Sequence, residues 1–174
     1  MTLHSERDKR VEFVALLAAF ALFLSTVEYM IPKPIPFMRI GLANLPLIIA
    51  LPLLSKKEYW LLALLKVLGQ GLVTGTLFSY IGLFSLVGTV ASALVMRVLF
   101  FSFKNSITFL GVSIGGAMAS NIAQLELARL FLFGSSVKFI APPFLVAGLI
   151  TSVVLGLFAN KFKERSLWYK EKLL

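Results

Sequence analysis

The chain has 174 residues, of which 59% are hydrophobic and 14% are charged, whereas soluble domains have about 45–50% and roughly 25%. A soluble domain of this size must cover a large surface with polar groups, so the composition excludes one and predicts an integral membrane protein. The formal net charge is +9. There is no cysteine, and His4 is the only histidine, so thiolate or histidine metal sites and Ser-His-Asp triads are excluded as well.

Uncharged stretches of the sequence predict six membrane-spanning helices, because one span needs about 20 mainly apolar residues. The long apolar run that begins at Tyr59 is divided near Ser79 and Tyr80. The predicted spans are residues 11–31, 40–55, 58–78, 81–101, 107–133 and 138–160. We therefore expect an all-α, six-helix transmembrane domain over residues 11–160, with a tail at residues 1–10 and a basic tail at residues 161–174.

The positions of the basic residues predict the orientation of these spans. The outer loops hold only Lys33, Arg39 and Lys138, while Lys66 and Arg129 fall within spans. The other twelve of the seventeen basic residues lie in the inner segments: Arg7, Lys9, Arg10, Lys56, Lys57, Arg97, Lys104, Lys161, Lys163, Arg165, Lys170 and Lys172. This bias predicts a multi-pass protein of the inner (cytoplasmic) membrane with both termini in the cytoplasm. It explains the net charge through the lipid bilayer, without nucleic acid as a partner.

The first outer loop and the second span are both rich in proline. Pro46 and Pro52 interrupt the second span, and interior prolines kink a helix. This segment either lines a cavity or is simply a kinked helix. The preceding loop contains Pro34, Phe37 and Arg39 and should be stiff. It is either a cap over an outward-facing pocket or a plain connector.

Charged side chains inside spans are candidate site residues, because each costs about 2.5–3.5 kcal/mol at mid-helix. Lys66 either meets an anionic substrate, pairs with Glu28 or Glu126, or extends to the cytoplasmic surface. Gln70 lies four residues further, on the same helix face. Glu126 and Arg129 are three residues apart, so they either neutralise each other or contact a ligand.

Amides and small residues give two further signals. Asn121 and Gln124 lie on one face of the fifth span, and Asn44 lies in the interrupted second span. Carboxamides in lipid need partners, so these side chains either hold the bundle together or bind a substrate. Ala15 and Ala19 in the first span are four residues apart, a spacing that permits close helix packing within the bundle or against another membrane subunit.

The sequence contains no motif for catalysis. Asp8 is the only aspartate, so there is no aspartate pair to hold magnesium against a diphosphate. No GxxxxGK[ST] loop for ATP is present either. We therefore expect a protein that is not an enzyme, binds no metal or cofactor, and takes energy for any transport from a partner.

Three segments carry a resemblance to a known family. They are residues 39–46 (RIGLANLP), Lys66 followed by residues 71–79 (GLVTGTLFS), and residues 120–124 (SNIAQ). Over about residues 11–160 the chain resembles the membrane family labelled heptaprenyl diphosphate synthase component I, also called the Gx transporter family. That family usually has an arginine where Lys66 stands and a histidine where Ser120 stands, which leaves the ligand open.

This family is similar to the substrate-binding S components of energy-coupling factor (ECF) transporters. The resemblance implies a six-helix fold with a pocket on the outer side and the first outer loop as its lid. It implies that Ala15 and Ala19 dock onto a transmembrane coupling subunit, which works with two ATPase subunits. The substrate would be a small vitamin or cofactor precursor, with Phe37 and Tyr80 able to stack on it. The candidate substrate contacts are Asn44, Lys66, Gln70, Asn121, Gln124, Glu126 and Arg129.

Two other functions remain open. The chain is alternatively a non-catalytic membrane subunit in isoprenoid or quinone metabolism that recruits or delivers a prenyl diphosphate. A synthase itself would need acidic metal-binding motifs, which this sequence lacks. A third possibility is a structural subunit of a membrane redox complex.

Overall fold

A computed structural model describes residues 2–32, 41–103, 106–167, 169 and 171. All regular secondary structure in these residues is helical. The main helices are α1 (Thr2–Met30), α2 (Leu45–Ala50), α3 (Lys56–Val73), α4 (Tyr80–Phe103), α5 (Phe109–Ala128) and α6 (Val137–Arg165). A short 3-10 turn, Leu42–Asn44, leads directly into α2. Between α5 and α6, Arg129–Phe133 forms a π-helical turn and Gly134–Ser136 forms a 3-10 turn.

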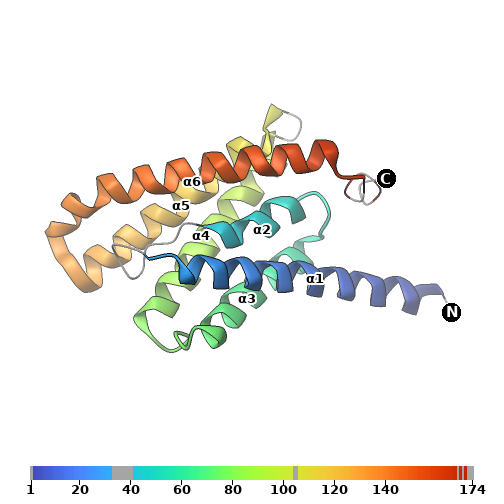
Figure 1. Cartoon of the computed structure of the whole chain (residues 1–174), viewed down its shortest axis with the longest axis horizontal. Helices are drawn as coiled ribbons and strands as arrows, with labels where there is room; N and C mark the ends of the chain where they lie inside the picture. Colours follow the sequence, from blue (N-terminus) through green and yellow to red (C-terminus); the bar gives the residue numbers. More distant parts are fainter. Residues whose placement is uncertain (1, 33–40, 104–105, 168, 170, 172–174) are drawn as a thin grey trace.

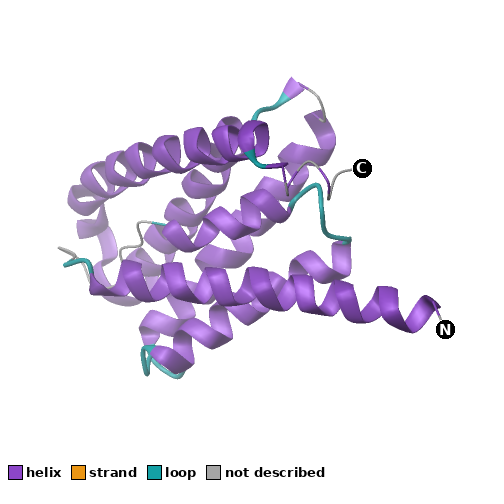
Figure 2. Cartoon of the chain, turned by 45° about the vertical axis from the view of Figure 1, so that its right-hand side comes forward, coloured by secondary structure: helices purple, strands orange, loops and turns teal. Residues whose placement is uncertain are grey.

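The helices form a bundle around the short helix α2. Helix α5 packs along both α4 and α6, α1 packs on α3, and α2 contacts α1, α3, α5 and α6. Figure 1 shows α2 in the middle of the bundle, between α1 and α6. The start of α1 and the end of α6 lie toward the same end of the bundle, and α1 extends beyond the other helices there (Figure 2).

Three segments are long and apolar enough to cross a membrane: Asp8–Met30, Tyr80–Phe103 and Phe109–Arg165. The last of these contains both α5 and α6. The predicted all-α fold is thus confirmed for the described residues, and their length and composition agree with a membrane protein. The six-span count and the cytoplasmic position of the termini stay predictions.

The predicted span over residues 40–55 is not a single kinked helix, which was one of the two forms that the sequence left open. Helix α2 has only six residues, and all six are buried. Pro46 lies in its first turn, where a missing backbone N–H breaks no helical hydrogen bond, and Pro52 follows its last residue. The two prolines therefore bound a short helix instead of kinking a long one, and α2 fills the core.

Part of the predicted C-terminal tail also belongs to the core. Helix α6 continues to Arg165, and Tyr169 beyond it is fully buried. Its hydroxyl donates a hydrogen bond of 3.0 Å to the carbonyl oxygen of Ile49, which is among the last carbonyls of α2 and so has no partner within that helix. Burial raises the pKa of the Tyr169 hydroxyl. The chain end thus caps the central helix.

We expect substitutions of Tyr169 to destabilise the fold in two steps. Tyr169→Phe should lower the free energy of unfolding by about 1 kcal/mol, because one hydrogen bond is lost. Tyr169→Ala should cost about 3–5 kcal/mol, because a cavity is left as well. Chemical unfolding of the purified protein in detergent measures both. Leu167→Ala, at an exposed position, is the control. Equal free energies of unfolding for Tyr169→Ala and this control would contradict the prediction.

Candidate ligand-binding site

The bundle encloses a small polar cavity of about 20 Å³. This volume is enough for roughly one water molecule. Helices α1, α3, α4, α5 and α6 and the turn before α2 all contribute to its walls. The lining residues are Glu28, Gly41, Ala43, Asn44, Lys66, Thr89, Ala117, Ser120, Asn121 and Gly148. We refer to these residues as the polar cluster.

Two buried charged residues hold the turn that precedes α2. Lys66 is 3% exposed, and its Nζ donates to Asn44 Oδ1 at 2.5 Å and to Thr89 Oγ1 at 3.4 Å. Glu28 is also 3% exposed, and its Oε2 accepts a hydrogen bond of 3.0 Å from the backbone N–H of Gly41. Buried charges are tolerated only with such partners. One end of the turn is therefore fixed by a carboxylate and the other by an ammonium group.

Gly41 is suited to its place in this turn because its φ is +90°. Glycine adopts this left-handed backbone conformation without the steric cost that a Cβ atom brings. The same residue thus begins the turn and presents its N–H to Glu28.

The amides of α5 are buried, and two of their polar atoms lack partners. Asn121 is 4% exposed and lines the cavity, and its Nδ2 has no hydrogen-bond partner among the described residues. Gln124 donates from Nε2 to Ser120 Oγ at 2.9 Å, while its Oε1 likewise has none there. A buried polar atom without a partner costs about 1–3 kcal/mol. A polar ligand next to Asn121 would remove that cost.

Glycines of the neighbouring helices make room for these amides. A Cβ atom on Gly148 of α6 would overlap the Asn121 amide, and one on Gly88 of α4 would overlap the Gln124 amide. Close helix packing and the polar cluster therefore depend on the same positions. The small residues of this bundle do more than bring two helix backbones together, since they also create the space that the amides fill.

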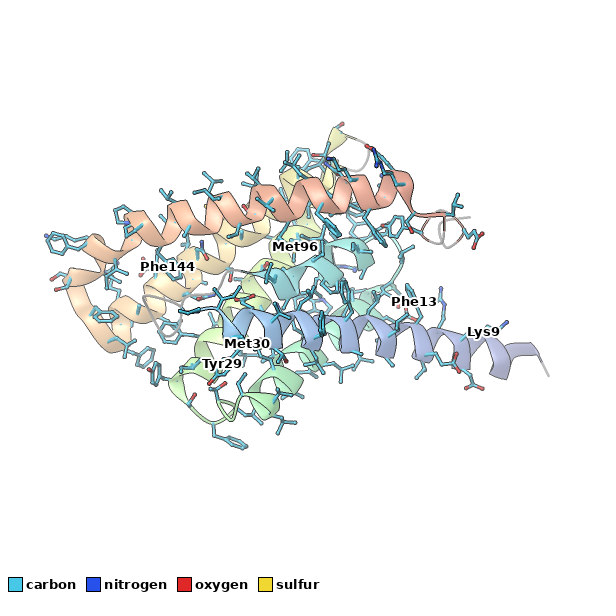
Figure 3. The ribbon with its side chains drawn as sticks, viewed as in Figure 1. Lys9, Phe13, Tyr29, Met30, Met96 and Phe144 are labelled. Atoms are coloured by element: carbon cyan, nitrogen blue, oxygen red, sulfur yellow. The ribbon has the colours of Figure 1, made fainter. Side chains whose placement is uncertain are left out.

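Apolar clusters lie on both sides of the polar cluster along the bundle. On one side Phe84, Leu125, Ala128 and Phe144 pack together. On the other side lies the larger core around α2, which includes Met96. Figure 3 labels Phe144 and Met96, which mark these two regions.

Three of the predicted site residues lie elsewhere. Gln70 is buried between α1 and α3, where its Oε1 accepts from Ser25 Oγ at 3.5 Å. Glu126 and Arg129 form an ion pair of 3.3 Å with each other, and both side chains are more than half exposed. The structure therefore joins Asn44, Lys66 and Asn121 around the cavity, with Gln124 behind them, and leaves the ion pair on the surface.

Tyr80, one of the two expected aromatic contacts, is not among the described residues that line the cavity. Tyr80 is half exposed and packs edge-on against Phe84, with 6.4 Å between ring centroids. Pro34, Phe37 and Arg39 lie outside the described residues. The lid stays a prediction.

Ala15 and Ala19 lie on the outer face of α1, where both are exposed. Ala15 also lines a groove of about 430 Å³ between α1 and α3, whose other walls include Val11, Leu61 and Leu65. The two alanines are thus exposed on the described bundle, and their contact with another subunit stays a prediction.

Sequence reasoning left several members of the polar cluster out of the site. Glu28 was visible as a charge near the end of a span, but it was considered only as a partner for Lys66. Thr89 gave no signal, because a single hydroxyl in a membrane helix is not distinctive, and Gly41 was noted only as part of the segment at residues 39–46. Their roles depend on which helices meet, and that information is not local.

We expect Gly148→Ala to displace the Asn121 side chain and to lower stability by about 1–3 kcal/mol through overpacking. The double variant Gly148→Ala with Asn121→Ala should recover part of this loss, since the new methyl group then occupies vacated space. Thermal unfolding of the four proteins in one detergent gives the coupling energy. Purely additive effects would contradict the proposed overlap.

The comparisons with known proteins agree with the resemblance seen in the sequence. A family model described as heptaprenyl diphosphate synthase component I matches residues 17–162, a range that includes every member of the polar cluster. The comparison with curated proteins and the comparison with solved structures gave no match. Because the family model covers most of the sequence, the chain belongs to the heptaprenyl diphosphate synthase component I family.

Proposed function

We propose that this chain is an S component-like subunit that captures a small vitamin or cofactor precursor from the outer side of the membrane for an ECF-type transporter. The observation that carries the proposal is the polar cluster, in which Glu28, Lys66 and Asn121 are buried among apolar helices. Ionisable residues inside membrane domains are costly and typically mark functional sites. The sequence offers binding groups there and no catalytic motif.

The small volume of the cavity implies that the ligand enters by displacing part of the protein. A volume of about 20 Å³ is far below the roughly 300–1,000 Å³ of ordinary ligand sites. The turn from Gly41 to Asn44 lines the cavity and is held there by Glu28 and Lys66. This turn directly follows the loop with Pro34, Phe37 and Arg39, so movement of that loop as a lid would open the site.

The exposed face of α1 supports the second half of the proposal. A substrate-binding subunit without a nucleotide-binding loop needs a coupling subunit and ATPases to drive transport. Ala15 and Ala19 are exposed there, and the adjoining groove between α1 and α3 is largely apolar. Small residues on an exposed apolar face permit close approach of a helix from another membrane subunit.

A different cavity favours the alternative function in prenyl diphosphate metabolism. It measures about 670 Å³ and lies where α4 ends and α5 begins. Its walls include Phe100, Phe101, Ile107 and Phe109, together with Lys163, whose Nζ lies 5.3 Å from the Phe109 ring centroid. Apolar walls beside a cation suit a prenyl chain with a diphosphate end. A non-catalytic subunit that delivers such a molecule would use this cavity.

Substitution in the polar cluster should abolish ligand capture. The wild-type protein, purified in mild detergent from its own membrane, should carry a small molecule that mass spectrometry detects after denaturation. Lys66→Met and Asn121→Ala should each lower its occupancy at least tenfold, since each removes a polar contact. Lys138→Met, which removes a lysine outside the cluster, should keep it.

This experiment also separates the two functions. Absence of any bound small molecule in the wild-type protein would contradict the capture role. A prenyl diphosphate whose occupancy falls in Lys163→Met, but not in Lys66→Met, would favour the alternative.

Bulky residues at the docking face should break the complex and leave the site intact. Ala15→Trp and Ala19→Trp should each reduce the amount of coupling subunit and ATPases recovered with the tagged chain, because a tryptophan prevents close helix approach. Val146→Trp, at an exposed position of α6, should leave recovery unchanged. Full recovery with both alanine variants would contradict docking through this face.

A further inference from the structure

We infer that the ligand of the polar cluster is a small aliphatic zwitterion, a molecule that carries a carboxylate and an ammonium group and no aromatic ring. This inference rests on the proposed capture role and adds the chemical class of the substrate. It follows from the charges of the cluster, from the atoms that now satisfy them, and from the size of the lining side chains.

The turn before α2 gives the Lys66 ammonium group a hydrogen-bond acceptor and the Glu28 carboxylate a hydrogen-bond donor. The carboxylate and the ammonium group of a zwitterion could take these two roles. Asn44 Oδ1 is an acceptor for the Lys66 ammonium group, at 2.5 Å, as a substrate carboxylate oxygen would be. The Gly41 N–H is a donor to the Glu28 carboxylate, at 3.0 Å, as a substrate ammonium group would be. The turn thus occupies the site with one acceptor and one donor.

Opening of the site removes both of these contacts together. Gly41 and Asn44 are the two ends of one short turn, so its withdrawal takes an acceptor from Lys66 and a donor from Glu28. A ligand with only an anionic group would replace the first contact and bring a like charge toward Glu28, which is unfavourable at low dielectric. A ligand with only a cationic group would bring a like charge toward Lys66, which is equally unfavourable. A zwitterion replaces both contacts.

The described lining residues favour a compact ligand without an aromatic ring. Among the described residues that line the cavity none is aromatic, and most are small: Gly41, Ala43, Thr89, Ala117, Ser120 and Gly148. Ring-containing vitamins are commonly held by stacking on aromatic side chains, and the described walls offer none. The free Nδ2 of Asn121 supplies a further donor for a carboxylate oxygen.

Matched probes test the charge requirement directly. The full-length protein in lipid nanodiscs is titrated with glycine, β-alanine and 4-aminobutyrate, and with propionate and propylamine as single-charge counterparts of β-alanine. At least one zwitterion should raise the unfolding temperature and bind at least tenfold more tightly than either counterpart. Glu28→Gln and Lys66→Met should each weaken that binding at least tenfold. Glu12→Gln and Lys138→Met, which change the same residue types outside the cluster, should not.

The identity of the co-purified molecule provides a test that does not depend on the variants folding. A bound molecule with both an amino and a carboxyl group supports the inference. A molecule whose occupancy falls in Lys66→Met, but that lacks either charge or contains an aromatic ring, overturns the inference and leaves the capture role standing. If no molecule co-purifies and no probe shifts the unfolding temperature, both the capture role and the zwitterion are overturned.

Discussion

The need to satisfy two opposite charges inside an apolar bundle determines the arrangement of this protein's centre. Glu28 on α1 and Lys66 on α3 are almost completely buried, and neither is stable there without hydrogen-bond partners. Both obtain them from the turn at Gly41–Asn44. Because α2 begins directly after that turn, the position of the central helix is tied to the two charges. The apolar clusters on either side then pack around this fixed point.

The parts of the fold that the sequence predicted are those with local signals. Long uncharged stretches define α1, α4, α5 and α6 well, because span length and hydropathy are properties of a single segment. Helix α2 was harder, since its prolines have different effects at the ends and in the middle of a helix. Pro46 and Pro52 bound α2, and their spacing alone did not distinguish this from a kink. The docking of Tyr169 against Ile49 joins distant parts of the chain and gave no signal.

In the candidate site, too, the residues with a local sequence signal were predicted and those that depend on contacts between helices were not. Lys66, Asn44 and Asn121 were recognisable because polar groups in apolar segments are conspicuous, and the structure places all three around one cavity. Glu126 and Arg129 carried the same signal, yet they pair with each other on the surface. Charge inside a predicted span therefore identifies candidates without indicating which face of the helix they occupy. Thr89 and Gly148 belong to the cavity only because α4 and α6 meet α5 there.

The contact between Tyr169 and Ile49 has a consequence for the order in which the molecule is completed. The two residues are 120 positions apart, so the carbonyl end of α2 acquires its cap only after Tyr169 has been synthesised. Until then, the carbonyl oxygen of Ile49 lacks this hydrogen bond, whereas Asn44 at the start of α2 already accepts one from Lys66. A tag or fusion partner attached close to the C-terminus would act on this contact. Because α2 directly follows the turn at Gly41–Asn44, such an attachment would also affect the position of that turn, although the two lie far apart in the sequence.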